Sequence, residues 1–280
     1  MLVAGAGLLA AGCAGLPGTA STPALTPPDK PLVGKFVWRD LVTEDPDSVK
    51  PFYAELFRWE FVDSTAFGAP YALVKSRGEL IAGISKARRS VPNQPVSQWI
   101  SFLSVASVDR AVDLTQREGG SLVAGPLDLP RVGRGAVVLD PEGAPLGLLR
   151  TSAGDPVDPA EPAINAFLWT EHLSRAPAEA AAFYARLTGS EVRRTEQAGI
   201  AYWLLWQGRP RAGLLRNPLA IDRPVWLAYV RVADPAAAAE RAARLGGRVL
   251  LAPRKEVRSG TLALVADPTG AVLALQKWPI

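Results

Sequence analysis

Two carboxylates at matched positions are the residues of this chain best placed to take part in chemistry. Asp40 lies two residues after Trp38, and Glu171 lies two residues after Trp169. Side chains two apart on a β-strand share a face, so each tryptophan is expected beside its carboxylate. Such a pair would suit a cationic ligand, or would act as a base if burial raised the pKa of the carboxyl group. Pairing with a nearby arginine is the structural alternative.

Aromatic residues on later predicted strands belong to the same surface. Strand alternation places Phe102 and Tyr229 on the same face as these tryptophan–carboxylate pairs. An aromatic pocket with a carboxylate suits a flat or cationic organic molecule, although core packing is an equally ordinary role for a tryptophan. The predicted ligand-binding residues are Trp38, Asp40, Phe102, Trp169, Glu171 and Tyr229.

Histidine and cysteine chemistry is limited by composition, because the chain has one residue of each type. Strand alternation places His172 on the face opposite Glu171, beneath the helices, which predicts a structural role. A single Cys13 excludes an intrachain disulfide. The sequence contains no glycine-rich phosphate loop, Ser-His-Asp set or nucleophile elbow, so we assign no catalytic residue.

The elements that must position these side chains occur twice. The pattern that begins at Phe36 returns at Phe167, and Val138–Ala144 (VLDPEGA) returns as Val265–Ala271 (VADPTGA). Solenoids and propellers repeat every ~20–50 residues, so this much longer period indicates a domain duplicated in tandem. A chain of 280 residues has room for about two domains.

Within each half, the spacing of apolar and turn residues predicts the order βαβββ twice, an α+β fold of four βαβββ modules. A helix is expected from Pro46, where Asp45 can cap it, and helices are expected at 177–187 and 235–245 in the second half. The remaining first-half elements are a helix over 108–118 and strands over 36–42, 59–63, 70–75, 79–86, 99–105, 121–124, 135–139 and 146–150.

The N-terminal segment predicts export. Residues 1–12 are apolar and small, too few to span a bilayer, and are typical of a signal peptide. The sequence Leu9-Ala-Ala-Gly-Cys13 resembles a bacterial lipobox, which implies lipidation of Cys13 and a membrane-anchored lipoprotein of the bacterial cell envelope, facing the periplasm or the exterior. Residues 13–32 are then a flexible tether rich in Pro, Thr and Ser. A chance cysteine in an Ala/Gly-rich stretch is the alternative.

The net charge of the chain does not indicate a nucleic-acid partner. The net charge is +4 with a pI near 9.4, but the basic residues are scattered among Asp and Glu. This pattern is typical of a solvated surface, so we expect no nucleic-acid partner.

The repeated modules, the Phe-Tyr pair on the first helix of each half and the Asp-Pro-x-Gly turn before its last strand resemble the vicinal oxygen chelate superfamily. This superfamily includes glyoxalase I, extradiol dioxygenases and bleomycin-resistance proteins. The resemblance implies two tandem domains with curved sheets of about eight strands, over residues 33–151 and 164–280, joined by a linker over 152–163.

The resemblance also implies where metal ligands would lie in the metal-dependent members. These positions are Trp38, Ala82 or Gly83, Ile100 and Gly147 in the first half, and Trp169, Ala212 or Gly213, Leu227 and Ala274 in the second half. None of these side chains is a metal donor. We therefore expect no metal and no other cofactor.

Three functions follow as hypotheses. The first is a lipid-anchored protein that binds a small organic molecule, aromatic or cationic, as the drug-binding members of the superfamily do. The second is a non-catalytic interaction protein of the envelope. The third is a lyase, isomerase or dioxygenase that acts without the usual metal.

Overall fold

The computed structural model describes residues 25–66, 69–88, 96–197, 199–218 and 223–279. The predicted signal peptide and Cys13 lie outside these residues. Among the described residues, no helix has the length and apolar character needed to cross a bilayer.

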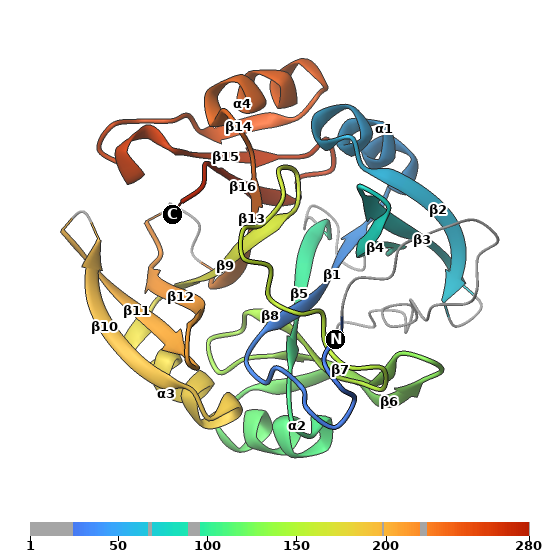
Figure 1. Cartoon of the computed structure of the whole chain (residues 1–280), viewed down its shortest axis with the longest axis vertical. Helices are drawn as coiled ribbons and strands as arrows, with labels where there is room; N and C mark the ends of the chain where they lie inside the picture. The colour runs from blue at the N-terminus through green and yellow to red at the C-terminus, as the bar shows by residue number, and fades with distance from the viewer. Residues whose placement is uncertain (1–24, 67–68, 89–95, 198, 219–222, 280) are drawn as a thin grey trace.

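The first half forms one curved sheet of eight strands, in the order β2-β3-β4-β1-β5-β8-β7-β6 (Figure 1). Two helices, α1 (Pro46–Phe57) and α2 (Val108–Arg117), follow the first strand of each module. The strands are β1 (Phe36–Thr43), β2 (Glu60–Ala66), β3 (Ala69–Ser76), β4 (Glu79–Lys86), β5 (Gln98–Ser104), β6 (Ser121–Leu129), β7 (Gly133–Leu139) and β8 (Pro145–Thr151).

The second half repeats this order as β10-β11-β12-β9-β13-β16-β15-β14, with helices α3 (Pro177–Thr188) and α4 (Pro235–Arg244). Its strands are β9 (Phe167–Ser174), β10 (Glu191–Gln197), β11 (Ile200–Trp206), β12 (Pro210–Arg216), β13 (Val225–Arg231), β14 (Arg248–Leu251), β15 (Leu262–Ala266) and β16 (Val272–Gln276). The prediction of four βαβββ modules in two curved sheets is confirmed. The largest difference is β6, which runs five residues past the expected end at Ala124 through bulges opposite β7.

Local sequence accounts for the helix starts. The carboxylate of Asp45 accepts a hydrogen bond from Ser48 N at 3.2 Å at the start of α1, and Asp234 caps α4 in the same way. Helix α3 has no capping side chain of its own. Glu142, from the Asp-Pro-x-Gly turn of the other half, instead accepts from Ala176 N at 3.0 Å.

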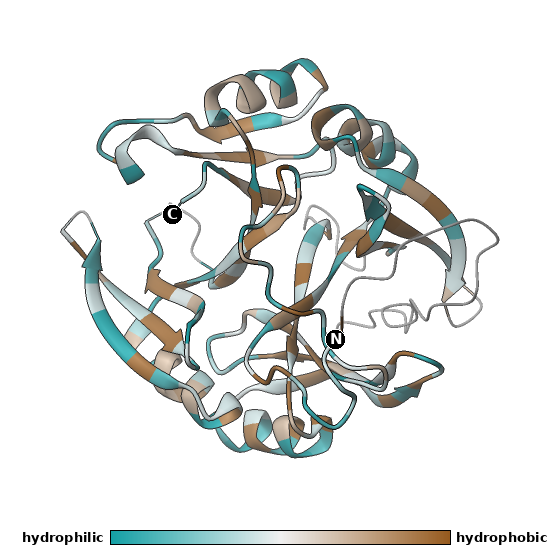
Figure 2. Cartoon of the chain, in the orientation of Figure 1, coloured by the Kyte–Doolittle hydropathy of each residue, from teal (hydrophilic) through white to brown (hydrophobic). Residues whose placement is uncertain are grey.

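The helices pack between the two halves. Figure 1 shows α1 beside α4 and α2 beside α3. Residues of α1 share one core cluster with β13, β15 and β16, while residues of α2 share another with α3 and β12. Figure 2 shows the hydrophobic residues gathered on the central strands, whereas the outermost strand β10 is largely hydrophilic. The two halves are thus joined by continuous hydrophobic cores.

The two repeated motifs form crosswise hydrogen bonds between the halves. Tyr53 Oη donates to Asp267 at 2.9 Å, and Tyr184 Oη donates to Asp140 at 2.7 Å. Each hydroxyl also accepts from a tryptophan, Trp99 at 3.0 Å or Trp226 at 2.7 Å. The Phe-Tyr pair and the Asp-Pro-x-Gly turn therefore hold the tandem domains together.

His172 belongs to one of these clusters. It is fully buried, and its Nε2 lies 2.9 Å from Asp140 Oδ2. Burial acts to raise the pKa of Asp140, but the close approach of His172 and the hydrogen bond from Tyr184 outweigh it and hold that pKa below its usual value. The imidazole thus lies under the helix layer, as strand alternation predicted.

The end of the predicted tether is not free. Leu25 pairs with Pro156, and Thr26 N donates to the Asp155 carbonyl at 2.8 Å. The Asp155 side chain is fully buried and accepts from Ser104 Oγ and Leu32 N, both at 2.6 Å. Composition indicated flexibility through residue 32, but these polar contacts fix the last residues of that segment on the linker.

Candidate functional site

The carboxylate of Asp40 lies at the centre of the concave face of the first sheet. Its side chain is 1% exposed, and Oδ1 accepts from Tyr71 Oη at 2.5 Å and Trp38 Nε1 at 2.9 Å. Its Oδ2 is buried with no hydrogen-bond partner among the described residues. Burial raises the pKa of Asp40 to about 7, although the hydrogen bonds from Tyr71 and Trp38 oppose this shift. A carboxyl group with that pKa can exchange a proton near neutral pH.

Aromatic side chains occupy the space around this carboxylate because neighbouring strands carry glycine. Gly83 of β4 is opposite Asp40, and a Cβ placed there would lie 1.6 Å from Tyr71 Oη. On β8, a Cβ at Gly147 would lie 2.2 Å from the ring of Phe102. Two positions that the family resemblance assigned to metal ligands are therefore filled by a tyrosine hydroxyl and a phenylalanine ring from adjacent strands.

The second sheet has the same arrangement of a buried carboxylate and tyrosine hydroxyls, but here an arginine compensates the charge of the carboxylate. Glu171 is 1% exposed and accepts from Tyr202 Oη at 2.5 Å, and also from the hydroxyl of Tyr229 and the guanidinium of Arg258. A Cβ on Gly213 would lie 1.7 Å from Tyr202 Oη. The salt bridge with Arg258 neutralises Glu171, so this carboxylate is not free to attract a cationic ligand.

The structure brings the six predicted ligand-binding residues together in two groups, one on each concave face. Asp40, Phe102, Glu171 and Tyr229 are buried, whereas Trp38 and Trp169 are partly exposed. Buried to this degree, the four inner side chains would meet a ligand only after neighbouring side chains moved. Their role in ligand contact stays a prediction.

The donors on the concave faces do not fit a divalent metal. Each described face offers one buried carboxylate, already bonded to at least one tyrosine hydroxyl. In the part of the chain that the structure describes, no three His, Cys, Asp or Glu side chains come together in a ligand set. These donors therefore give no basis for a metal-dependent step.

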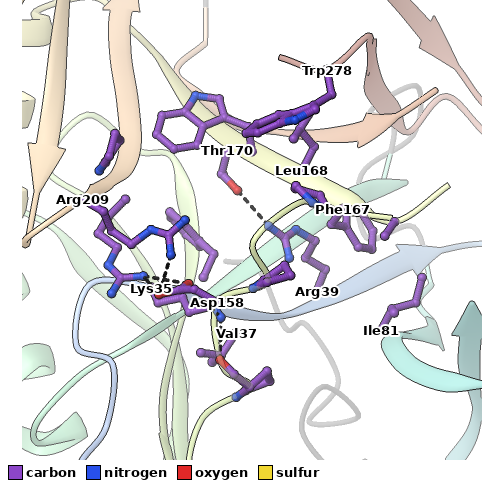
Figure 3. Close-up of a pocket in the computed structure, with 18 of the residues that line it drawn as sticks. Lys35, Val37, Arg39, Ile81, Asp158, Phe167, Leu168, Thr170, Arg209 and Trp278 are labelled. Carbon is purple, nitrogen blue, oxygen red and sulfur yellow. Dashed lines mark hydrogen bonds and ion pairs between the residues drawn. The ribbon is translucent and has the colours of Figure 1, made fainter. Parts of the chain in front are cut away.

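A cavity of about 550 Å³ lies between the two halves (Figure 3). Its walls come from the first residues of β1 and β9, the linker, and strands β4, β11 and β12. Five aromatic side chains line it: Phe36, Phe167, Trp169, Tyr202 and Trp278. This volume is in the range of small-molecule sites, which are concave and mostly apolar with a few polar groups.

The polar groups of the cavity are mainly cationic. Asp158 of the linker forms ion pairs with Arg211 at 2.7 Å, Lys35 at 3.1 Å and Arg209 at 3.5 Å. Arg258 also lines the cavity. Burial lowers the pKa of Lys35, while the attraction of Asp158 opposes that change.

Arg39 is the most deeply buried of these cations. It is 8% exposed, its Nη2 donates to Thr170 Oγ1 at 3.0 Å, and its guanidinium lies 4.4 Å from the ring centre of Phe167. Among the described residues, no carboxylate pairs with it and its Nε has no hydrogen-bond partner. Figure 3 shows its side chain between Phe167 and the group around Asp158.

Sequence reasoning missed this cavity and Arg39. The sequence did hold a signal for a buried arginine. Strand alternation puts Arg39 on the face opposite Trp38 and Asp40, the same face as the core residue Leu41. An arginine on a core-facing parity needs a partner or a ligand. Nothing local indicated that this face would end at a cavity between domains.

Comparison with known proteins agrees with this architecture. The family model described as a glyoxalase-like domain matches residues 171–275. CFP32 of Mycobacterium tuberculosis, a glyoxylase by name, is 30% identical over 244 residues, which cover 86% of this chain and 93% of that protein. The anthracycline biosynthesis protein DnrV of Streptomyces peucetius is 27% identical over 255 residues, covering 85% of this chain and 91% of that protein.

A solved structure shows the same fold. The Mn(II)-bound glyoxalase from Novosphingobium aromaticivorans superposes with a TM-score of 0.60 at 17% identity, covering 88% of this chain and 82% of that chain. The chain therefore belongs to the glyoxalase-like proteins of the vicinal oxygen chelate superfamily, with two tandem domains.

Proposed function

We propose that this protein binds a small aromatic molecule in the cavity between its two domains and does not transform it through a metal centre. The observation that carries the proposal is the cavity of about 550 Å³ with aromatic rings from both halves. Rings of this kind offer stacking surface at low entropic cost. The concave faces, where the superfamily's chemistry is expected, hold packed tyrosine and phenylalanine side chains instead.

The names of the relatives are compatible with this proposal. DnrV is named for the biosynthesis of anthracyclines, which are polycyclic aromatic compounds. CFP32 is named as a glyoxylase, an activity for which this chain offers no set of metal donors among its described residues. Binding without turnover therefore fits the residues present better than metal-dependent catalysis.

The test is a thermal-shift screen with 2-naphthol, 2-naphthamide and 2-naphthoate. A ligand that binds the folded state must raise the melting temperature in proportion to the logarithm of its concentration above Kd. Ala160→Trp places a ring on the exposed linker at the cavity wall and should reduce every shift. Ala243→Trp adds the same ring on the exposed side of α4 and should leave the shifts unchanged. The proposal is wrong if no compound raises the melting temperature, or if both variants respond as the wild type does.

We also propose that the protein is exported and anchored through lipid on Cys13. The support is Leu9-Ala-Ala-Gly-Cys13 and the Pro/Thr/Ser-rich segment that follows it. Expression of Cys13→Ser in a bacterial host should move the protein from the membrane fraction to the soluble fraction. Unchanged membrane partition, or a mature chain that still begins at Met1, would contradict the proposal.

A further inference from the structure

We infer that the ligand of the interdomain cavity is an aromatic anion, and that Arg39 binds its carboxylate. This inference rests on the proposed function and names the ligand class for the same cavity. It begins from a buried cation that no carboxylate in the described part of the chain neutralises. Arg39 is 8% exposed, and among the described residues its partners are a hydroxyl and an aromatic ring.

An unpaired charge in the interior costs free energy, so its burial needs a compensating partner. The ring of Phe167 and the hydroxyl of Thr170 stabilise the guanidinium partly. Burial lowers the pKa of Arg39 to about 9, which still leaves it charged at neutral pH. Arg39 lines the cavity, and its buried Nε has no hydrogen-bond partner among the described residues. A guanidinium with free donors in a low-dielectric cavity favours a planar carboxylate, which it can bind through two hydrogen bonds.

The cavity as a whole carries a net positive charge, the same sign as the charge of Arg39. Five cations line it, and three carboxylates among the described residues offset them: Asp158 at the wall, Glu171, which pairs with Arg258, and the buried Asp155, whose charge acts on Lys35. An excess of two positive charges remains. The field would draw an anion into the cavity and repel the cationic ligand that Asp40 and Glu171 suggested in the sequence.

The internal symmetry explains why one anchoring group is present. Thr170 on β9 is the repeat equivalent of Arg39 on β1, and the two side chains meet in a hydrogen bond of 3.0 Å. The duplicated strands thus approach each other at this point, and only one of them carries a cation. A ligand with a single acidic group fits this arrangement, with its ring against the aromatic walls.

The experiment compares two probes that differ in charge, 2-naphthoate and its neutral isostere 2-naphthamide, by isothermal titration at pH 7.5. Arg39→Met should raise the Kd for 2-naphthoate at least about tenfold, since it removes a charge-assisted hydrogen-bond pair. The Kd for 2-naphthamide should change less than about twofold. Arg39→Lys should recover part of the affinity for the acid. Arg186→Met, which removes a surface arginine paired with Glu118, is the matched control and should affect neither probe.

A second readout separates ligand binding from a structural role. If Arg39 serves a ligand, the ligand-free Arg39→Met protein should melt at least about 2 °C higher than the wild type, because an uncompensated buried charge is gone. A lower melting temperature for Arg39→Met would assign Arg39 to folding and overturn the inference. Equal losses for both probes, or no loss, would also overturn it while leaving the cavity as a binding site. Failure of both probes to bind the wild type would refute the proposed function and this inference with it.

Discussion

Replacing Asp40 with asparagine should stabilise the protein above neutral pH and destabilise it in acid. The carboxyl group is 1% exposed, and burial raises its pKa from 3.8 to about 7. A shift of roughly three pKa units corresponds to about 4 kcal/mol between the protonation states, at about 1.36 kcal/mol per unit. This is the order of magnitude of the free energy that ionised Asp40 costs the folded protein.

The sign follows from proton binding. Well below pH 4, Asp40 is protonated in both folded and unfolded states, and its burial carries no charge penalty. Between about pH 4 and 7 the folded state retains a proton that the unfolded chain has lost, so the free energy of unfolding falls as pH rises. Above pH 7 the penalty is complete. An asparagine side chain cannot ionise, so the Asp40→Asn variant would not lose this stability.

The asparagine amide has a cost of its own. Its oxygen can accept the hydrogen bonds of Tyr71 and Trp38, but its NH2 group would replace Oδ2, which has no partner among the described residues. An unsatisfied buried donor costs about 1–3 kcal/mol. We expect Asp40→Asn to be less stable than the wild type by about 1–3 kcal/mol at pH 4, and more stable by about 1–3 kcal/mol at pH 9.

Urea unfolding followed by tryptophan fluorescence at several pH values from 4 to 9 would measure this difference, with an unchanged m-value as the test of two-state behaviour. Glu171→Gln is the matched comparison, because it leaves the partly buried Arg258 without its carboxylate and should cost about 3 kcal/mol at pH 7. A stability difference between Asp40→Asn and the wild type that stays constant across this pH range would refute the reasoning.

Two further predictions concern the packing. Tyr53→Phe and Tyr184→Phe each remove a buried hydroxyl that bonds both a carboxylate and a tryptophan, so each should lower the free energy of unfolding by about 1–3 kcal/mol in urea titrations. The two losses should add within about 0.5 kcal/mol, since the clusters lie at different module interfaces; strong non-additivity would contradict their independence. Gly83→Ala and Gly213→Ala should each cost about 3 kcal/mol or more, because the new Cβ would lie within 2 Å of a tyrosine hydroxyl. A melting temperature within 1 °C of the wild type would show that the tyrosine moves aside freely.

The sequence by itself determined the duplication, the four modules and most element positions. These features follow from local patterns: strand alternation, helical spacing after Asp45, and the Asp-Pro-x-Gly turns. It also placed His172 on the face opposite Glu171, since strand parity needs no tertiary information. The ends of elements were less well determined, because bulges such as those of β6 depend on the partner strand.

Only the tertiary structure decided which charges remain available. Glu171 is neutralised by Arg258, 87 residues later in the chain, whereas Asp40 contacts tyrosine and tryptophan and has no cationic partner among the residues that the structure describes. The interdomain cavity forms where β1, β9 and the linker meet, and its unpaired Arg39 touches Thr170, 131 residues away. Local patterns determine which face a side chain takes. Charge compensation depends on tertiary contacts instead: folding of the second half brings Arg258 to Glu171, and the packing of the two halves brings Thr170 to Arg39.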